Sequence, residues 1–262
     1  MELNQMIFAT DEKPLENLAV NGGYTSIFRR IGVIGDSLAS GEFESLDENG
    51  NKSYHDYFEY SWGQNIARMC GSKCYNFSRG GMTAKEYCES FADYMRFWNP
   101  EYACQCYIIA LGVNDIQNQN QDIGSIDDIK EDYTQNGKTF MGYYAQIIQR
   151  VKKIQPRAKI FLMTMMNESG NHRIREKTEA HRKAIFEIAE HFDNIYVLDF
   201  YKYGPEFNEE FRKKFYMGGH LNPMGYVLVA HMVTSYIDFI IRHNFEDFKE
   251  VGFIGTDLKY NR

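Results

Sequence analysis

Residues 29–38 have the sequence RRIGVIGDSL, and this stretch decides the interpretation of the fold. Its apolar run ends at Gly35, and Asp36 and Ser37 follow at once, as expected where a buried strand runs into a turn. A serine just beyond the carboxyl end of a strand lies where open α/β sheets bind their ligands. Ser37 is therefore a candidate nucleophile, although an Asp-Ser pair can also simply cap a helix.

Four further apolar runs of strand length follow along the chain, and helical patterns separate them. The runs lie at 73–77, 104–111, 158–166 and 195–200, and helices are expected at 62–70, 83–98, 140–154, 171–192 and 223–243. Strands that alternate with helices predict an α/β fold with three layers, α/β/α. The middle layer is a parallel five-stranded sheet, and helices cover both of its faces. We expect a single domain over 1–262, with 1–30 as an N-terminal extension and 244–262 as a C-terminal tail. The polar segment 112–142 is too long for a routine connection, which is typical of functional loops.

The composition argues against several classes of function. The net charge is −7 and the basic residues are scattered, so no nucleic-acid partner is expected. No run approaches the roughly 18 apolar residues of a membrane span, and the N-terminus lacks a signal-peptide pattern. These features predict a cytoplasmic protein with no membrane partner.

No cofactor or metal site is expected either. The five cysteines are odd in number and have no metal-ligand spacing, which favours free structural thiols. Gly137-Lys138-Thr139 resembles the end of a P-loop, but Asp132 stands where the earlier glycine belongs and no strand precedes it.

Four sequence blocks occur in order at the ends of successive predicted elements. They are Gly35-Asp36-Ser37-Leu38, then NFSRGGMT at 76–83, GVND at 112–115 and HLNPMGY at 220–226. Together they resemble the SGNH (GDSL) hydrolase superfamily. The resemblance implies a flavodoxin-like SGNH hydrolase fold and a serine hydrolase that acts on ester bonds.

The resemblance also implies roles for individual residues. Ser37 matches the nucleophile and His220 matches the general base, while the other six histidines are expected to be ordinary core or surface residues. Asn114 and Gly81 match the family's oxyanion donors, which would act with the Ser37 N–H on the negative oxygen of the intermediate. Gly80 is the alternative to Gly81, and the Gly-Gly pair can also be only a tight turn.

The sequence departs from the family pattern at one position. The family has an aspartate three residues before the catalytic histidine, and here that residue is Met217, whose thioether carries no charge. Three explanations stay open: a backbone carbonyl near 215–218 accepts the Nδ1–H of His220, or Asp199 replaces the aspartate, or another carboxylate does so. Loss of hydrolysis is the remaining possibility.

The leading functional hypothesis is a serine esterase that hydrolyses short acyl, preferably acetyl, esters of a carbohydrate or another small soluble alcohol. The alternatives are a catalytically decayed carbohydrate-binding protein, a lysophospholipase, a thioesterase or an acyltransferase. The aromatic content of 15% includes residues that should border the active-site edge and offer sugar-stacking faces: Tyr54, Tyr57, Phe58, Tyr60, Trp62, Tyr133, Tyr201, Tyr203, Phe215 and Tyr216. The sequence leaves the oligomeric state open.

Overall fold

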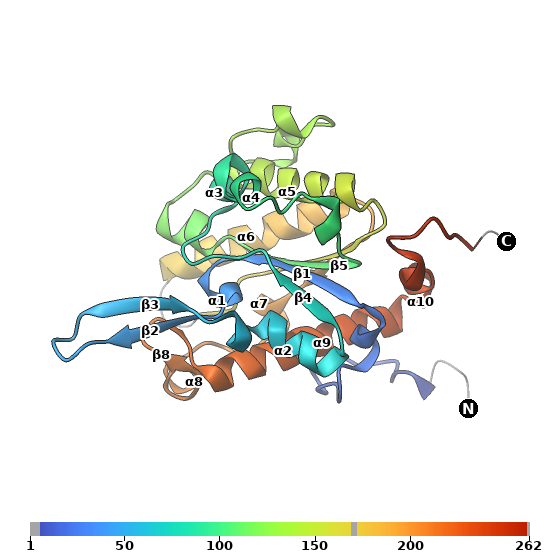
Figure 1. The fold of residues 1–262 in the computed structure, drawn as a ribbon. Helices are drawn as coiled ribbons and strands as arrows, with labels where there is room; N and C mark the ends of the chain where they lie inside the picture. Colours follow the sequence, from blue (N-terminus) through green and yellow to red (C-terminus); the bar gives the residue numbers. More distant parts are fainter. Residues whose placement is uncertain (1–5, 169–171, 261–262) are drawn as a thin grey trace.

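A parallel sheet of five strands forms the centre of the computed structural model, which describes residues 6–168 and 172–260 (Figure 1). The strand order is β4-β1-β5-β6-β7. The strands are β1 (Arg30–Gly35), β4 (Lys73–Asn76), β5 (Cys106–Ala110), β6 (Lys159–Met163) and β7 (Ile195–Leu198). All five lie within the runs predicted from sequence, so the predicted sheet is confirmed.

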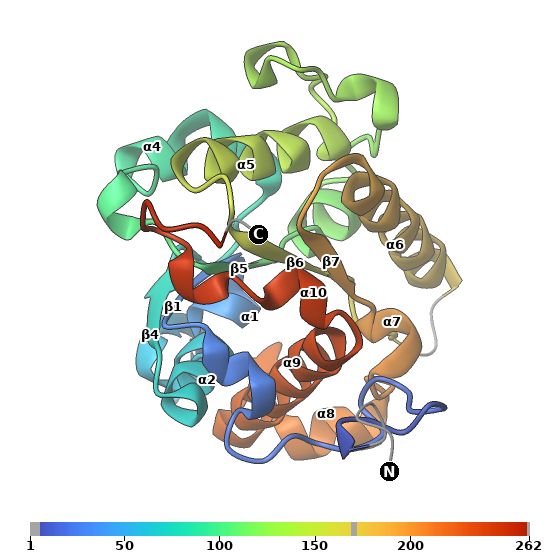
Figure 2. The same cartoon turned by 90° about the vertical axis from the view of Figure 1, so that its right-hand side faces the viewer.

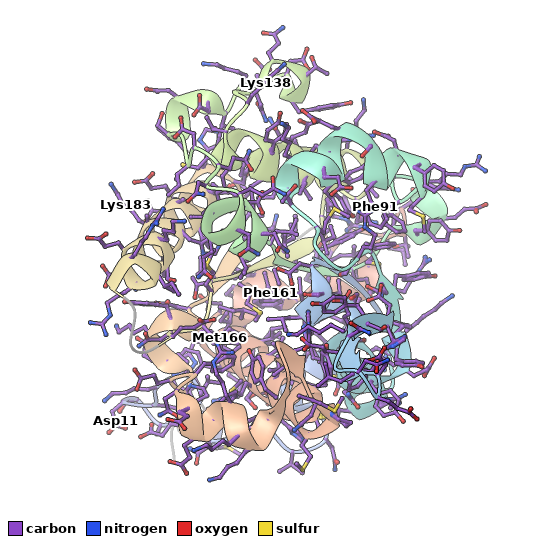
Figure 3. All side chains as sticks on the ribbon, turned by 90° about the vertical axis from the view of Figure 1, so that its left-hand side faces the viewer. Asp11, Phe91, Lys138, Phe161, Met166 and Lys183 are labelled. Carbon is purple, nitrogen blue, oxygen red and sulfur yellow. The ribbon has the colours of Figure 1, made fainter. Side chains whose placement is uncertain are left out.

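Helices cover both faces of the sheet, which confirms the three-layer α/β/α architecture (Figure 2). Adjacent strand residues point to opposite faces, so Ile108 packs with the helices on one side and Ile109 with those on the other. The first side is covered by α2 (Trp62–Cys70) and α9 (Pro223–His243), and the second by α3 (Ala84–Glu86), α4 (Ala92–Tyr94), α5 (Phe140–Ile154) and α6 (His172–His191). Phe161 of β6 lies in the middle of the molecule, whereas Lys138 and Lys183 lie at its surface (Figure 3).

The segment after Ser37 contains an element that the sequence did not predict. Helix α1 (Ser37–Ser40) has only four residues, because Gly41 takes a left-handed conformation with φ of 87° and its N–H bonds to the Ser37 carbonyl. The chain then forms an antiparallel hairpin of β2 (Glu42–Leu46) and β3 (Lys52–Asp56). This hairpin projects from the edge of the molecule in Figure 1.

Several other elements were not predicted or are shorter than predicted. The helical stretch after Thr83 contains a π turn at Tyr87–Phe91 between α3 and α4. The segment 112–142 holds only short turns before α5, namely Val113–Asn118, Ile126–Asp128 and Tyr133–Gln135. The remaining elements are α7 (Phe200–Tyr203), α8 (Glu209–Phe215), β8 (Tyr216–Met217), β9 (His220–Leu221), α10 (Phe245–Phe248) and the turns Gly23–Ile27, Phe58–Tyr60, Pro100–Tyr102 and Val251–Phe253.

The described parts of both chain ends contact the core. The Thr25 hydroxyl donates to the Thr234 carbonyl of α9 at 2.8 Å, and Arg242 pairs with Glu12. At the other end, Arg157 donates to the Thr256 carbonyl at 2.8 Å. Residues 1–5, 169–171 and 261–262, which the predictions included, lie outside the described residues.

Helix α9 is also the core helix of its layer. Among the described residues it is the one helix long and apolar enough to cross a membrane, and 72% of its apolar window is buried inside the fold.

All five cysteines are buried and free, which agrees with structural thiols.

Candidate active site

Ser37 lies directly after β1, at the carboxyl edge of the sheet. Asp36 caps the short helix α1, because its carboxylate accepts the Leu38 N–H at 3.1 Å. Burial raises the pKa of Asp36 to about 7, and the Leu38 hydrogen bond only partly opposes that effect. The nucleophile candidate therefore sits on a turn whose preceding carboxyl group is buried.

His220 begins β9, and this strand packs against α1, the short helix that Ser37 begins. The imidazole is mostly buried, with Nε2 3.1 Å from Glu42 Oε1. Burial lowers the pKa of His220 below its usual value, while Glu44 and Asp56 oppose that shift. The Nε2 atom faces Glu42. No hydrogen bond between His220 and Ser37 occurs in the described part of the chain.

The two predicted oxyanion donors lie in loops that are tied together. The Asn114 amide donates to the Met82 carbonyl at 3.2 Å, and the Asn118 amide donates to Asn114 Oδ1 at 2.7 Å, which fixes the Asn114 amide orientation. An amide has two N–H donors, so one stays available to a substrate. Gly81 has a left-handed φ of 71° and open space where a Cβ would lie.

Gly80, the alternative donor, is packed differently. A Cβ at Gly80 would overlap the Glu42 carboxylate. Gly81 thus has the more open surroundings and remains the predicted donor.

Asp115 links the loop that contains Asn114 to the loop that contains Gly81. Its buried carboxylate accepts the Ala84 N–H at 2.8 Å and so joins the GVND turn to the start of α3. Burial raises the pKa of Asp115 to about 6, and hydrogen bonds from the backbone oppose the shift. Asp115 therefore supports the position of Asn114.

The structure argues against two of the explanations considered for Met217, which stands where the resemblance implies an aspartate. His220 Nδ1 is buried and has no hydrogen-bond partner among the described residues, so the predicted backbone carbonyl near 215–218 does not bind it. Asp199 lies at the carboxyl end of β7 as predicted, but its carboxylate is bound by the Arg182 guanidinium through bonds of 2.7 to 3.0 Å. Met217 itself is 47% exposed.

Two carboxylates that the sequence did not single out, Glu42 and Glu44 on β2, face His220. Glu44 Oε2 lies 3.9 Å from His220 Nδ1, while Glu42 Oε1 is near Nε2. Residues two apart on a strand share a face, so the Glu-Phe-Glu alternation directly after the nucleophile block was the available signal. The signal is short, and its detection needed the hairpin to be predicted first.

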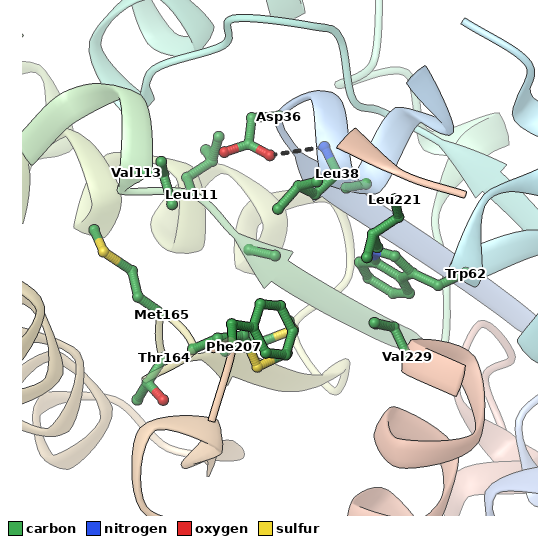
Figure 4. A pocket seen from close by; sticks show the side chains of 14 residues that line it. Asp36, Leu38, Trp62, Leu111, Val113, Thr164, Met165, Phe207, Leu221 and Val229 are labelled. Atoms are coloured by element: carbon green, nitrogen blue, oxygen red, sulfur yellow. Dashed lines mark hydrogen bonds between the residues drawn. The ribbon is translucent and has the colours of Figure 1, made fainter. Parts of the chain in front are cut away.

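An apolar cavity of about 60 Å³ lies beneath the nucleophile turn (Figure 4). Its lining includes Asp36 and Leu38, the two neighbours of Ser37 in the chain. Its other walls come from the carboxyl ends of β5 and β6 and from α2 and α9, among them Trp62, Leu111, Met163, Met165 and Val229.

The predicted aromatic rim is present only in part. Tyr54 is 55% exposed, and its ring lies 5.6 Å from the His220 ring in an edge contact. Tyr57 and Tyr60 are also exposed, but their rings pack on Phe43. Trp62 is buried in the core and cannot contribute to a rim.

The other members of the predicted rim have contacts of their own. Tyr133 is near Arg150 and Lys153, Tyr201 donates to Glu179, Tyr203 packs on Tyr236, and Phe58 is packed against the core, while Phe215 and Tyr216 pack on Phe211. Tyr54 is the rim residue in ring contact with His220.

Most other histidines whose surroundings are described have local partners, as expected. His181 is buried in the core, where its Nε2 is 3.1 Å from the Leu111 carbonyl, and burial lowers its pKa to about 4. His55 pairs with Ser45 at 2.9 Å. Within residues 6–168 and 172–260, no group of three or more His, Cys, Asp or Glu could hold a metal ion.

The arrangement defines a class: an α/β/α protein with a serine after β1, an asparagine after β5 and a histidine before the last long helix, all at one sheet edge. The sequence of residues 33–228 matches the GDSL-like lipase/acylhydrolase family, and the chain belongs to that family. Members of this family are ester hydrolases of the SGNH type. A comparison of the sequence with curated proteins finds no match.

Solved structures of esterases share the fold. A family two carbohydrate esterase from Clostridium thermocellum, in complex with cellohexaose, matches with a TM-score of 0.56 at 17% identity, over 91% of this chain and 67% of that one. The psychrotrophic esterase EstA from Pseudoalteromonas sp., inhibited by monoethylphosphonate, matches with a TM-score of 0.52 at 14% identity, over 81% of this chain and 98% of that one. At these identities the likeness concerns the fold.

Proposed function

We propose that this protein is a serine esterase that hydrolyses short acyl esters of a carbohydrate or another small soluble alcohol through an acyl-enzyme on Ser37. The observation that carries the proposal is the convergence of Ser37, His220 and Asn114 at one edge of the sheet, through the packing of α1 on β9 and the tie between Asn114 and the Gly81 loop. A serine beside a histidine base and amide donors is the constellation that acyl transfer requires.

In the proposed first step, Ser37 Oγ attacks the ester carbonyl carbon and forms a new C–O bond. His220 Nε2 takes the hydroxyl proton and then gives it to the leaving alcohol as the ester C–O bond breaks. The Gly81 and Ser37 N–H groups and the Asn114 amide stabilise the oxyanion, and loss of one such donor costs about 3 to 4 kcal/mol. Water then attacks the acyl-enzyme by the same sequence of proton transfers and releases the acid.

The cavity beneath the nucleophile turn supports a short acyl group. Its volume of about 60 Å³ is small and its walls are apolar, which suits a methyl or ethyl group better than a fatty acyl chain. Tyr54 supports a sugar-like leaving group, because its exposed ring offers a stacking face beside His220.

The decisive experiment measures turnover of p-nitrophenyl acetate by the wild type and by Ser37→Ala. We expect the variant to lose activity by about 10³-fold or more, because the nucleophile is gone. Ser90→Ala, which removes an exposed hydroxyl from a surface helix, is the matched control and should behave as the wild type. Full turnover by Ser37→Ala would refute the mechanism.

A fluorophosphonate probe separates this proposal from a catalytically decayed binding protein. An activated Ser37 forms a covalent phosphonate ester, whereas an unactivated serine stays unlabelled. We expect labelling of the wild type and of Ser90→Ala but none of Ser37→Ala. Absence of labelling in the wild type would favour the binding protein.

A substrate series tests the leaving group. Replacement of Tyr54 by alanine should raise KM for an acetylated oligosaccharide about 5-fold, since a lost aromatic contact costs about 1 kcal/mol, and should affect p-nitrophenyl acetate less. Tyr94→Ala, which removes an exposed ring on α4, is the control. Equal effects of Tyr54→Ala on both substrates would remove the preference for a carbohydrate.

A further inference from the structure

We propose that Glu44 is the positioning residue of His220 and takes the place of the aspartate that is missing at position 217. This inference rests on the proposed esterase function. The carboxylate comes from the hairpin β2–β3 rather than from the segment before His220. Glu44 Oε2 is 3.9 Å from Nδ1, and Nδ1 is buried and without a hydrogen-bond partner among the residues described.

Glu44 is held as a buried, charged carboxylate. It is only 5% exposed, and it accepts hydrogen bonds from the Lys52 ammonium at 2.7 Å and from the Gly219 N–H at 2.9 Å. These two bonds hold the pKa of Glu44 below its usual value. A charged carboxylate beside the imidazole is the group that stabilises the imidazolium formed during catalysis.

The turn before His220 is shaped around this carboxylate. Gly218 has a left-handed φ of 67°, and a Cβ there would overlap the Glu44 carboxylate. A Cβ at Gly219 would lie 3.2 Å from Glu44 Oε2. The Gly218-Gly219 pair thus opens the space that Glu44 fills and supplies the N–H that anchors it.

The gap between Glu44 Oε2 and His220 Nδ1 is small, and a proton on Nδ1 suits the role of Nε2, the other imidazole nitrogen, as the base. Glu44 must approach Nδ1 by about 1 Å to form a normal hydrogen bond. With the Nδ1 proton directed at Glu44, the neutral imidazole keeps its lone pair on Nε2, where the base function needs it. Glu42 Oε1 lies 3.1 Å from Nε2, and burial together with Asp56 raises the pKa of Glu42.

The test compares kcat/KM for p-nitrophenyl acetate between wild type and Glu44→Gln. The amide keeps an oxygen for the Gly219 N–H but removes the charge, so we expect a loss on the order of 10²- to 10⁴-fold. Glu48→Gln, the same change on the exposed turn of the same hairpin, is the matched control and should stay at the wild-type level. Glu44→Asp should recover part of the loss, and thermal unfolding checks that each variant folds.

The pH profile distinguishes positioning from a merely structural role. The charged and titratable groups near the imidazole are Glu42 and Glu44 from β2 and Lys52, Tyr54 and Asp56 from β3. Glu44 raises the pKa of His220, so Glu44→Gln should move the acid limb of kcat/KM to lower pH. A variant that only loosens the fold leaves the limb in place.

Each outcome has one meaning. An active wild type with Glu44→Gln within a few-fold of it, or with Glu42→Gln costing as much as Glu44→Gln, overturns the assignment of Glu44. An inactive, unlabelled wild type overturns the esterase proposal instead.

Discussion

Two opposing effects act on the pKa of the His220 imidazole. Burial favours its neutral form, and nearby carboxylates favour its charged form. Burial has the larger effect and lowers the pKa of His220, whereas Glu44 and Asp56 raise it. A general base must be unprotonated before the reaction begins, so a lowered pKa keeps it ready near neutral pH.

This balance predicts the pH dependence of the wild type. Because the pKa of His220 is lowered from an ordinary histidine value of about 6.5, kcat/KM for p-nitrophenyl acetate should be level at pH 7 and fall only as the pH drops through a value below about 6.5. Initial rates between about pH 4.5 and 8 measure the limb. A limb centred at about pH 7 or above would show that the carboxylates outweigh burial.

At the level of single residues, Ser37, His220, Asn114 and Gly81 could be chosen from sequence because they lie within family blocks. Glu42 and Glu44 lie outside the blocks, and their approach to His220 depends on how a hairpin folds back over the sheet edge. No local sequence pattern predicts the contact between the hairpin and the His220 segment, because it joins residues about 175 positions apart in the chain.

At the level of elements, the five strands of the sheet could be predicted because each is a buried apolar run. The β2–β3 hairpin could not be predicted from sequence, because β3 is exposed along its whole length and β2 alternates Glu with Phe over only three residues. Its position depends on tertiary contacts instead: Ser40 bonds to Asp56 at its base, and the Tyr226 hydroxyl donates to the Glu42 carbonyl at 2.6 Å. Such contacts override weak strand propensity.

The turn between β8 and β9 offers a prediction at this scale. Gly218→Ala should displace the Glu44 carboxylate and lower kcat/KM at least about 10-fold, in addition to a strain of about 1 to 2 kcal/mol for a left-handed alanine. Gly71→Ala is the matched control, because Gly71 has a similar φ of 62° but nothing within 4 Å of its Cβ position. The control should lose stability alone. Unchanged activity in Gly218→Ala would mean that the turn does not need to accommodate Glu44.

At the level of the whole molecule, the order of the elements gathers the site. Parallel strands all end at one edge, so the segments that follow β1, β4 and β5 meet there although they are far apart in sequence. The same convergence buries acidic groups: Asp36 and Asp115 are both inside the fold at this edge. A buried carboxylate lowers the free energy of unfolding unless it is paired, so this edge is expected to reduce stability.

The pH dependence of unfolding should reveal that effect at Asp36. Its native pKa of about 7 exceeds the ordinary aspartate value of about 4, so the native state binds an extra proton between these pH values. The free energy of unfolding therefore falls as the pH rises from about 4 to about 7 and levels off above that. Asp36→Asn keeps a good helix cap and removes the buried charge, and it should stabilise the protein at about pH 8 by on the order of 2 to 4 kcal/mol. The gain should shrink below about pH 7 and vanish near about pH 4. Urea unfolding across this range measures it, with the exposed Asp193→Asn as control; a gain that does not vary with pH would mean that Asp36 is not the group responsible.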